Sequence, residues 1–215
     1  MSDEGVNRVS HGQPVSSLSG PPEPVWPFSG VPELEAPQAR LLGAFGHVPG
    51  TYRSLAHAPQ IMNGWLDMAW LLRREATVDE GVRELAILRK GYLHNVDYLW
   101  RHHWEMALKV GVTPAKVAAV HQWRDSAEFT PAERAVLTVV DELTTECRIS
   151  PEAWQGLRQQ FTDKEAVELV VIIGFYSCAA QTMAGLQVRL EDSFSDVPPV
   201  PAKVGMETGT SPISG

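Results

Sequence analysis

Signals for helix boundaries dominate the middle of this 215-residue chain. Residues 77–80, 130–133 and 162–165 each begin with a threonine and end with a glutamate, a spacing in which hydroxyl and carboxylate satisfy each other's backbone amides at a helix start. Thr113 and Ser150 each precede a proline, which is another common way to begin a helix. No stretch alternates apolar and polar residues cleanly, so we expect no strands. The pattern predicts an all-α fold.

The same signals predict about eight helices. We place them near residues 36–45, 59–75, 78–91, 96–110, 114–123, 131–146, 151–160 and 163–191. Asn95 is expected to cap the start of the helix that ends at Gly111. Glycine and proline gather in residues 1–32, and residues 196–215 are similar. We therefore expect a flexible N-terminal arm, one helical domain over residues 33–195 and a flexible C-terminal tail.

Charge and composition exclude several classes of function. The net charge is −8 and the pI about 5.3, which argues against binding to nucleic acid or to an anionic membrane. The N-terminus lacks the pattern of a signal peptide, and the longest apolar run, residues 169–175, is too short to span a bilayer. Neither Cys147 nor Cys178 lies in a metal-ligand or CxxC spacing, so we expect a reduced, cytoplasmic environment.

Candidate chemistry concentrates between Glu84 and His103. In the helix expected at 96–110, His103 falls on the apolar stripe with Val96, Leu99 and Ala107. Glu84 falls on the buried face of the preceding helix, where a carboxylate needs a partner. A carboxylate bonded to one imidazole nitrogen fixes the tautomer and makes the other nitrogen more basic, as proton-transfer catalysis requires. The structural alternative is a satisfied ion pair in the core.

Other residues nearby are secondary candidates. Tyr98, His102, Trp100, Asp97 and His94 are assigned to substrate binding. The histidines and Asp97 lack the spacing of a metal site, so no metal and no cofactor are expected. Several tryptophans can wall a pocket for a cyclic ligand, namely Trp65, Trp70, Trp100 and Trp104. The charged run 73–75 is interpreted as a solvated surface.

The segment from Arg83 through Tyr98, Trp100 and His103 to Gly111 resembles the carboxymuconolactone decarboxylase family, which includes the AhpD-like alkylhydroperoxidases. The resemblance extends over residues 130–143 and 168–190, so it covers roughly residues 38–191. It implies an all-α fold that forms homo-oligomers, commonly dimers, trimers or hexamers. It also implies that Glu84 and His103 are the motif glutamate and histidine.

Two departures from the family pattern bear on mechanism. The two cysteines of the peroxidase branch would fall at Val96 and Leu99, so dithiol chemistry is not available there. The branch without thiols commonly reads Glu-Tyr-Glu-Trp at positions 97–100, where this chain reads Asp-Tyr-Leu-Trp. The chain thus resembles the decarboxylase-type branch, but the sequence does not name its substrate.

The leading hypothesis is a cofactor-independent lyase or isomerase that acts on a small lactone or oxo carboxylic acid. His103 would move a proton at carbon, Glu84 would hold the imidazole, and Tyr98 or His102 would contact a carboxylate or carbonyl group. One alternative is a ligand-binding or assembly protein without catalysis. Another is a divergent peroxidase that uses Cys178 or Cys147.

Overall fold

The computed structural model of this chain describes residues 30–203, so almost all of the expected N-terminal arm and residues 204–215 lie outside the described part. Within residues 30–203 the fold contains helices and no strands, as predicted. The α-helices are α1 (Pro32–Phe45), α2 (Gly50–Leu55), α3 (Pro59–Arg74), α4 (Glu80–His94), α5 (Asp97–Lys109), α6 (Pro114–Ala119), α7 (Pro131–Thr145), α8 (Pro151–Gln160) and α9 (Asp163–Gly185). Two 3₁₀ helices, η1 (Val120–Asp125) and η2 (Asp192–Phe194), complete the set.

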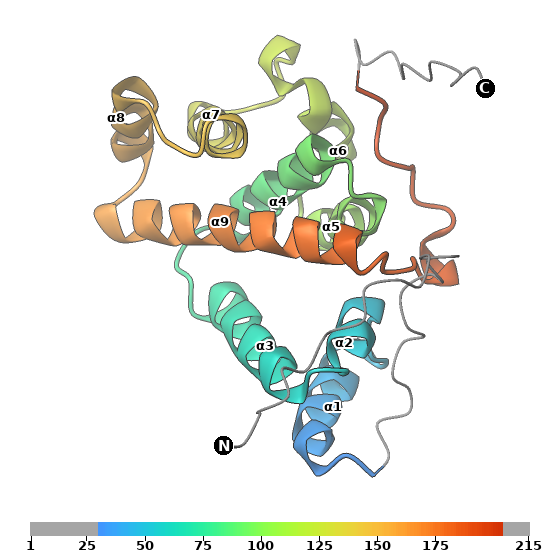
Figure 1. Cartoon of the computed structure of the whole chain (residues 1–215). Coiled ribbons are helices and arrows are strands. Elements are labelled where there is room, and N and C mark those ends of the chain that lie inside the picture. Colours follow the sequence, from blue (N-terminus) through green and yellow to red (C-terminus); the bar gives the residue numbers. More distant parts are fainter. Residues whose placement is uncertain (1–29, 204–215) are drawn as a thin grey trace, which may run out of the picture.

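The long helix α9 divides the molecule in Figure 1, with α1 to α3 on one side and α4 to α8 on the other. Helix α4 is the centre of the second group because it packs against α5, α7 and α9, and every residue from 83 to 91 on it is buried. Gly91 allows the close approach of α5: a Cβ there would lie 3.1 Å from the backbone nitrogen of Trp100. This approach brings the two candidate catalytic helices together.

Most of the predicted helix starts are confirmed. Thr130 and Thr162 form complete capping boxes, and Thr113 and Ser150 accept the expected backbone hydrogen bonds. The prediction for residues 77–80 was wrong. Asp79 caps α4, whereas the Thr77 hydroxyl donates to Glu168 of α9 at 3.0 Å. The carboxylate of Glu168, and not that of Glu80, is thus the partner of Thr77.

Three helix predictions need correction. Asn95 does not begin α5; it ends α4 in the left-handed conformation, with φ of 55°, and Val96 is the N-cap of α5. The six-residue helix α2 was missed, since Pro49 is its N-cap and Gly50 its first residue, and tertiary packing rather than propensity stabilises so short a helix. Helix α9 ends at Gly185, six residues before the expected end, and Gln187 follows with φ of 48°.

By length and composition, α9 is the one described helix that is long and apolar enough to cross a membrane. Buried core helices pass the same test, and seven residues of α9 are buried here, from Ala166 at one end to Ala180 at the other. Its apolar character is thus partly accounted for by packing against α4 and α7.

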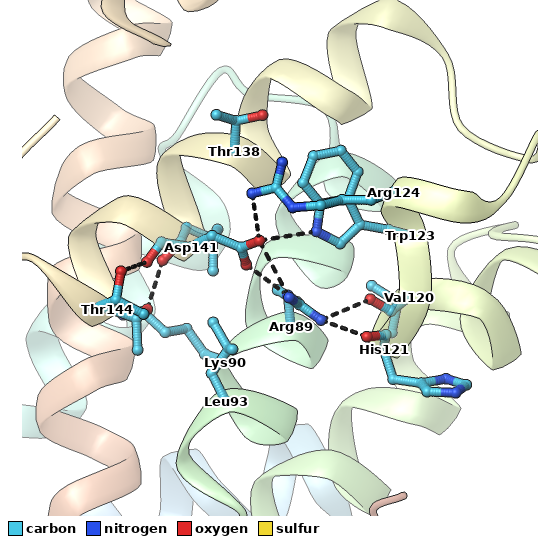
Figure 2. Close-up of polar contacts among 12 residues, drawn as sticks. Arg89, Lys90, Leu93, Val120, His121, Trp123, Arg124, Thr138, Asp141 and Thr144 are labelled. Carbon is cyan, nitrogen blue, oxygen red and sulfur yellow. Dashed lines mark hydrogen bonds and ion pairs between the residues drawn. The ribbon is translucent and has the colours of Figure 1, made fainter. Parts of the chain in front are cut away.

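A buried polar network ties α4 to α7 and η1 (Figure 2). The Arg89 guanidinium donates to both carboxylate oxygens of Asp141, from Nε at 2.6 Å and from Nη2 at 3.1 Å, and to the carbonyl of His121 at 2.6 Å. Trp123 and Arg124 also donate to Asp141. Beside this network the Lys90 amine donates to the Thr144 hydroxyl at 2.5 Å. These contacts hold α4 against α7 and η1.

The chain after α9 folds back along α5 and makes specific contacts. We call residues 186–203 the C-terminal strap. Arg101 donates to the carbonyls of Phe194 and Val197, and the Trp100 indole donates to the carbonyl of Pro198. The Val200 amide donates to Asp97 at 2.8 Å. Residues 196–203, which were expected to begin a flexible tail, are therefore held against α4 and α5.

Candidate functional site

Glu84 of α4 and His103 of α5 meet in the core. His103 Nδ1 donates to Glu84 Oε2 at 2.6 Å, and the two side chains are almost fully buried. The second carboxylate oxygen of Glu84 lies 3.6 Å from Arg83 Nε. The ring of Tyr176, from α9, stands edge-on against the imidazole with centroids 5.1 Å apart. These contacts fix the tautomer of His103 and leave Nε2 as the nitrogen available for chemistry.

Burial and charge set the protonation of this pair. Burial lowers the pKa of His103, although the Glu84 carboxylate opposes the shift. Burial alone would raise the pKa of Glu84, but the charge and hydrogen bond of His103, with Arg83 and Arg73, hold it below its ordinary value. At neutral pH the pair is therefore a neutral imidazole that donates to an ionised carboxylate. An unprotonated Nε2 is what a general base requires.

The pair lies at the wall of a cavity of about 450 Å³, a volume typical of small-molecule sites. His103 lines the cavity, whereas Glu84 sits behind it, with 1% of its surface exposed. The walls are largely apolar and aromatic, including Trp65, Leu99 and Phe175. The polar lining groups include Arg73, Tyr52 and Tyr98. This arrangement suits an amphipathic organic ligand that contacts the imidazole of His103.

A second acid–histidine pair borders the same cavity. His102 of α5 contacts Glu191 of the C-terminal strap, with Nε2 and Oε2 2.8 Å apart. Glu191 Oε1 accepts from the Gly50 amide at 2.7 Å and from the Tyr98 hydroxyl at 3.2 Å. Burial alone would raise the pKa of Glu191, but the hydrogen bonds from His102 and Gly50 and the charge of His102 bring it to about 2. Glu191 is therefore ionised at neutral pH.

The structure brings some of the predicted substrate-binding residues to the cavity and leaves others outside. Tyr98 and His102 line it, as do Glu84's partner His103 and Trp65. Trp100, Asp97 and His94 are not part of the lining. Trp100 is a core residue that also binds the strap, because its face of α5 turns toward α4. Asp97 pairs with Arg101 at 2.8 Å and holds the strap, so its carboxylate is already engaged.

His94 lies at the end of α4, where Lys90 and Lys203 are its charged neighbours. Burial, with these two cations, lowers its pKa, and its Nε2 has no hydrogen-bond partner in the described part of the chain. Within residues 30–203 no group of three potential metal ligands comes together. His94 and His103 thus belong to different environments.

Sequence reasoning missed three groups at the cavity. Arg73 was taken as a solvated charge, yet its side chain lines the cavity and stacks over Phe45, with the guanidinium 5.5 Å from the ring centroid. Tyr176 and Glu191 fell within the helix expected at residues 163–191 and were given no role at a site. A buried tyrosine on an apolar helix and an acid shortly after its glycine end were signals in the sequence, but neither pointed to α5 without the tertiary fold.

The positions that would carry a dithiol are filled by core aliphatic residues. Leu99 is fully buried and lines the cavity, and Val96 is buried at the start of α5. Cys147 and Cys178 are exposed and lie outside the lining. Thiol chemistry at this cavity would therefore require a cysteine that neither helix supplies.

The chain is similar to known proteins in sequence and in fold. The sequence profile of the carboxymuconolactone decarboxylase family matches residues 59–142, which include both Glu84 and His103. The uncharacterised protein YdfG of Bacillus subtilis (strain 168) is 25% identical over 118 residues, covering 54% of this chain and 80% of YdfG.

Among solved structures, an uncharacterised peroxidase-related protein from Silicibacter sp. TM1040 has a TM-score of 0.71 at 15% identity, covering 84% of this chain and 98% of its own. A variant of the debrominase Bmp8 in complex with 2,3,4-tribromopyrrole has a TM-score of 0.70 at 16% identity, with 84% and 95% covered. An alkylhydroperoxidase AhpD core from Ralstonia eutropha JMP134 has a TM-score of 0.68 at 19% identity, with 75% and 87% covered. These likenesses show the fold. Residues 59–142 of this chain are thus similar to the carboxymuconolactone decarboxylase family, and its fold is the AhpD-like helical fold.

Proposed function

We propose that this chain is a cofactor-independent acid–base enzyme, a decarboxylase or a related lyase or isomerase, that acts on a small lactone or oxo carboxylic acid. The observation that carries the proposal is the 2.6 Å bond between His103 Nδ1 and Glu84 Oε2 at the wall of the cavity. The bond holds a neutral imidazole whose free nitrogen can exchange a proton with a bound ligand.

The proton steps balance within this one pair. In isomerisation, His103 Nε2 removes a proton from a carbon next to a carbonyl group, and the C–H electron pair moves into an enolate. The resulting imidazolium, stabilised by the Glu84 carboxylate, returns the proton to another carbon of the same conjugated system. In decarboxylation of a substrate in its carboxylic acid form, His103 Nε2 first takes the carboxyl proton. The electron pair of the breaking C–C bond then forms the enolate, carbon dioxide leaves, and the imidazolium of His103 returns that proton to carbon. Both reactions end with carbon protonation by His103.

Arg73 supports an organic acid as the ligand. In the described part of the chain no carboxylate lies within ion-pair distance of its guanidinium, and its charge already acts on Glu84, His103 and Tyr176. A cation without a carboxylate partner in a largely apolar and aromatic cavity favours an anion, and a guanidinium binds a carboxylate with two hydrogen bonds. The negative charge of the whole chain does not oppose this, because the local field decides binding.

The experiment follows proton exchange at carbon. Levulinate (4-oxopentanoate) is incubated with the protein in deuterium oxide, deuterium uptake next to the ketone is measured by NMR, and carbon dioxide release from acetoacetate is measured in parallel. We expect His103→Gln to lower the faster of the two rates by at least about 100-fold, and Glu84→Gln by about 10-fold or more, since each removes part of the base. Glu168→Gln is the matched control, because that carboxylate binds a loop away from the cavity. Equal rates in wild type and His103→Gln would overturn the proposal.

A binding role without catalysis is the second candidate, and the aromatic wall of Trp65 and Phe175, with centroids 5.1 Å apart, favours it. In that case levulinate or a related acid would bind, and Arg73→Met would weaken binding. Neither deuterium uptake nor carbon dioxide release would exceed the rate without protein.

A further inference from the structure

Two neighbouring histidines of α5 each give one nitrogen to a buried or half-buried carboxylate at a single cavity. His103 donates to Glu84 from the core side, and His102 contacts Glu191 from the side of the C-terminal strap. Adjacent residues on a helix point about 100° apart, so the two imidazoles address the cavity from different directions. The proposed proton transfer uses only His103.

Several contacts between the C-terminal strap and the rest of the domain hold Glu191 in position. Its carboxylate accepts from the Gly50 amide, from the Tyr98 hydroxyl and from His102, which come from α2 and α5. A Cβ on Gly50 would lie 3.1 Å from the Arg189 carbonyl and 3.4 Å from Glu191 Oε1, so only glycine admits the strap without a shift. Burial and the charge of Glu191 raise the pKa of Tyr98, which therefore keeps the proton that it donates.

Neighbouring side chains pack on the ring of His102 and engage one of its two nitrogens. Tyr98 stacks on it with centroids 4.3 Å apart, and Phe194 of the strap packs on it at 4.0 Å. Nε2 is engaged by the ionised Glu191. Within residues 30–203, Nδ1 of His102 has no hydrogen-bond partner. Nδ1 is therefore the ring nitrogen that remains for a bound molecule.

We propose that the C-terminal strap completes the active site, with Glu191 as a positioning residue that holds His102 as an imidazolium, so that its Nδ1–H donates to the carbonyl oxygen of the substrate. This inference rests on the proposed function, which it deepens: His103 moves the proton at carbon while His102 holds the oxygen on which the enolate charge develops. Stabilising that oxygen lowers the barrier to enolate formation. The substrate class is then a compound with both a carboxylate, for Arg73, and a separate carbonyl group.

Three probes separate these contacts. Levulinate carries a carboxylate and a ketone, pentanoate lacks the ketone, and methyl levulinate lacks the carboxylate charge. Binding of each to the full chain is measured by calorimetry, and the imidazole nitrogens are followed by ¹⁵N NMR. We expect wild type to bind levulinate about 10-fold more tightly than pentanoate, as one charge-assisted hydrogen bond allows. Levulinate, but not pentanoate, should shift the Nδ1 signal of His102.

Variants of Glu191 and His102 test whether the C-terminal strap positions His102 for the substrate. In Glu191→Gln and His102→Phe the preference for levulinate over pentanoate should fall below about 2-fold, whereas pentanoate affinity stays within about 2-fold of wild type. Gly50→Ala, whose Cβ would crowd both the Arg189 carbonyl and Glu191 Oε1, should act in the same direction. Glu168→Gln should leave the preference unchanged.

The outcomes distinguish this inference from the proposed function. If levulinate drives deuterium exchange through His103 but leaves Nδ1 of His102 unmoved, or if the preference survives in Glu191→Gln, His102 is only a wall residue and the inference is wrong. If none of the three probes binds wild type, both proposals fall.

Discussion

The burial of His103 makes the stability of the domain depend on pH. Because its pKa in the folded chain lies below the ordinary 6.5, the unfolded chain binds a proton near pH 6 that the folded chain does not. Stability therefore falls as pH drops below about 6.5, by up to about 1.4 kcal/mol per pH unit. Glu84 does not contribute in this window, since its lowered pKa keeps it ionised until more acidic pH.

We expect urea unfolding at pH 7.5, 6.5 and 5.5 to show this loss in wild type and a weaker loss in His103→Gln, which cannot take up that proton. The other histidines are common to both proteins, so the difference between the two slopes isolates His103. Parallel slopes would mean that the imidazole is hydrated or already protonated in the folded chain.

Lys90 is a buried amine with 0% of its surface exposed, and its hydrogen-bond partner is the Thr144 hydroxyl. Burial lowers its pKa to about 8 from 10.5, so stability is lost as pH falls from 10.5 to 8, where only the unfolded chain binds the proton. We predict that Lys90→Met raises the free energy of unfolding at pH 7 by about 1 to 2 kcal/mol, the usual gain on removing a poorly compensated buried charge. Thermal melts measure it, with the exposed Lys164→Met as control. A lower melting temperature for Lys90→Met would refute the prediction.

At the scale of elements, the pair of Arg89 and Asp141 joins α4 to α7 (Figure 2). Asp141→Asn leaves the buried guanidinium without a counter-charge, which typically costs about 3 to 5 kcal/mol. The double variant Arg89→Met with Asp141→Leu removes both charges and should recover part of that loss. Urea unfolding of the three proteins measures both effects. A double variant no more stable than Asp141→Asn would show that packing, not charge, dominates there.

Local sequence signals predicted most elements because the caps are short-range interactions: Thr130 and Thr162 bond residues three positions away. The pair of Glu84 and His103 was predictable for a similar reason, since helix periodicity places both on buried faces. Glu191 was not, because it contacts His102 across 89 residues of sequence and only after α9 ends early. Arg73 was misread because a charge on a helix end looks the same whether it faces solvent or a cavity.

At the scale of the whole molecule, an apolar stripe of α9 faces outward. Val167 is 59% exposed and Val171 38%, and Gly174 and Cys178 continue the same side of the helix. Between Glu168 and Arg189 the helix and its end carry no charged residue. Contiguous exposed apolar surface of this kind commonly marks a protein interface, and the family resemblance implies homo-oligomers. We therefore expect α9 to contact a second copy of the chain.

Sedimentation equilibrium tests this expectation. We predict that the full chain sediments as a homo-oligomer at micromolar concentration, and that Val167→Lys combined with Val171→Lys shifts it toward the monomer, because burying two ammonium groups against an apolar partner costs several kcal/mol. Gln155→Lys on the exposed side of α8 adds charge elsewhere and should leave the mass unchanged. If the double variant keeps the oligomer, another surface forms the interface; the apolar face of α3 with Ile61, Met68 and Leu71 is then the next to alter. A wild-type chain that stays monomeric at all concentrations would contradict the expectation and would confine the cavity to a single subunit.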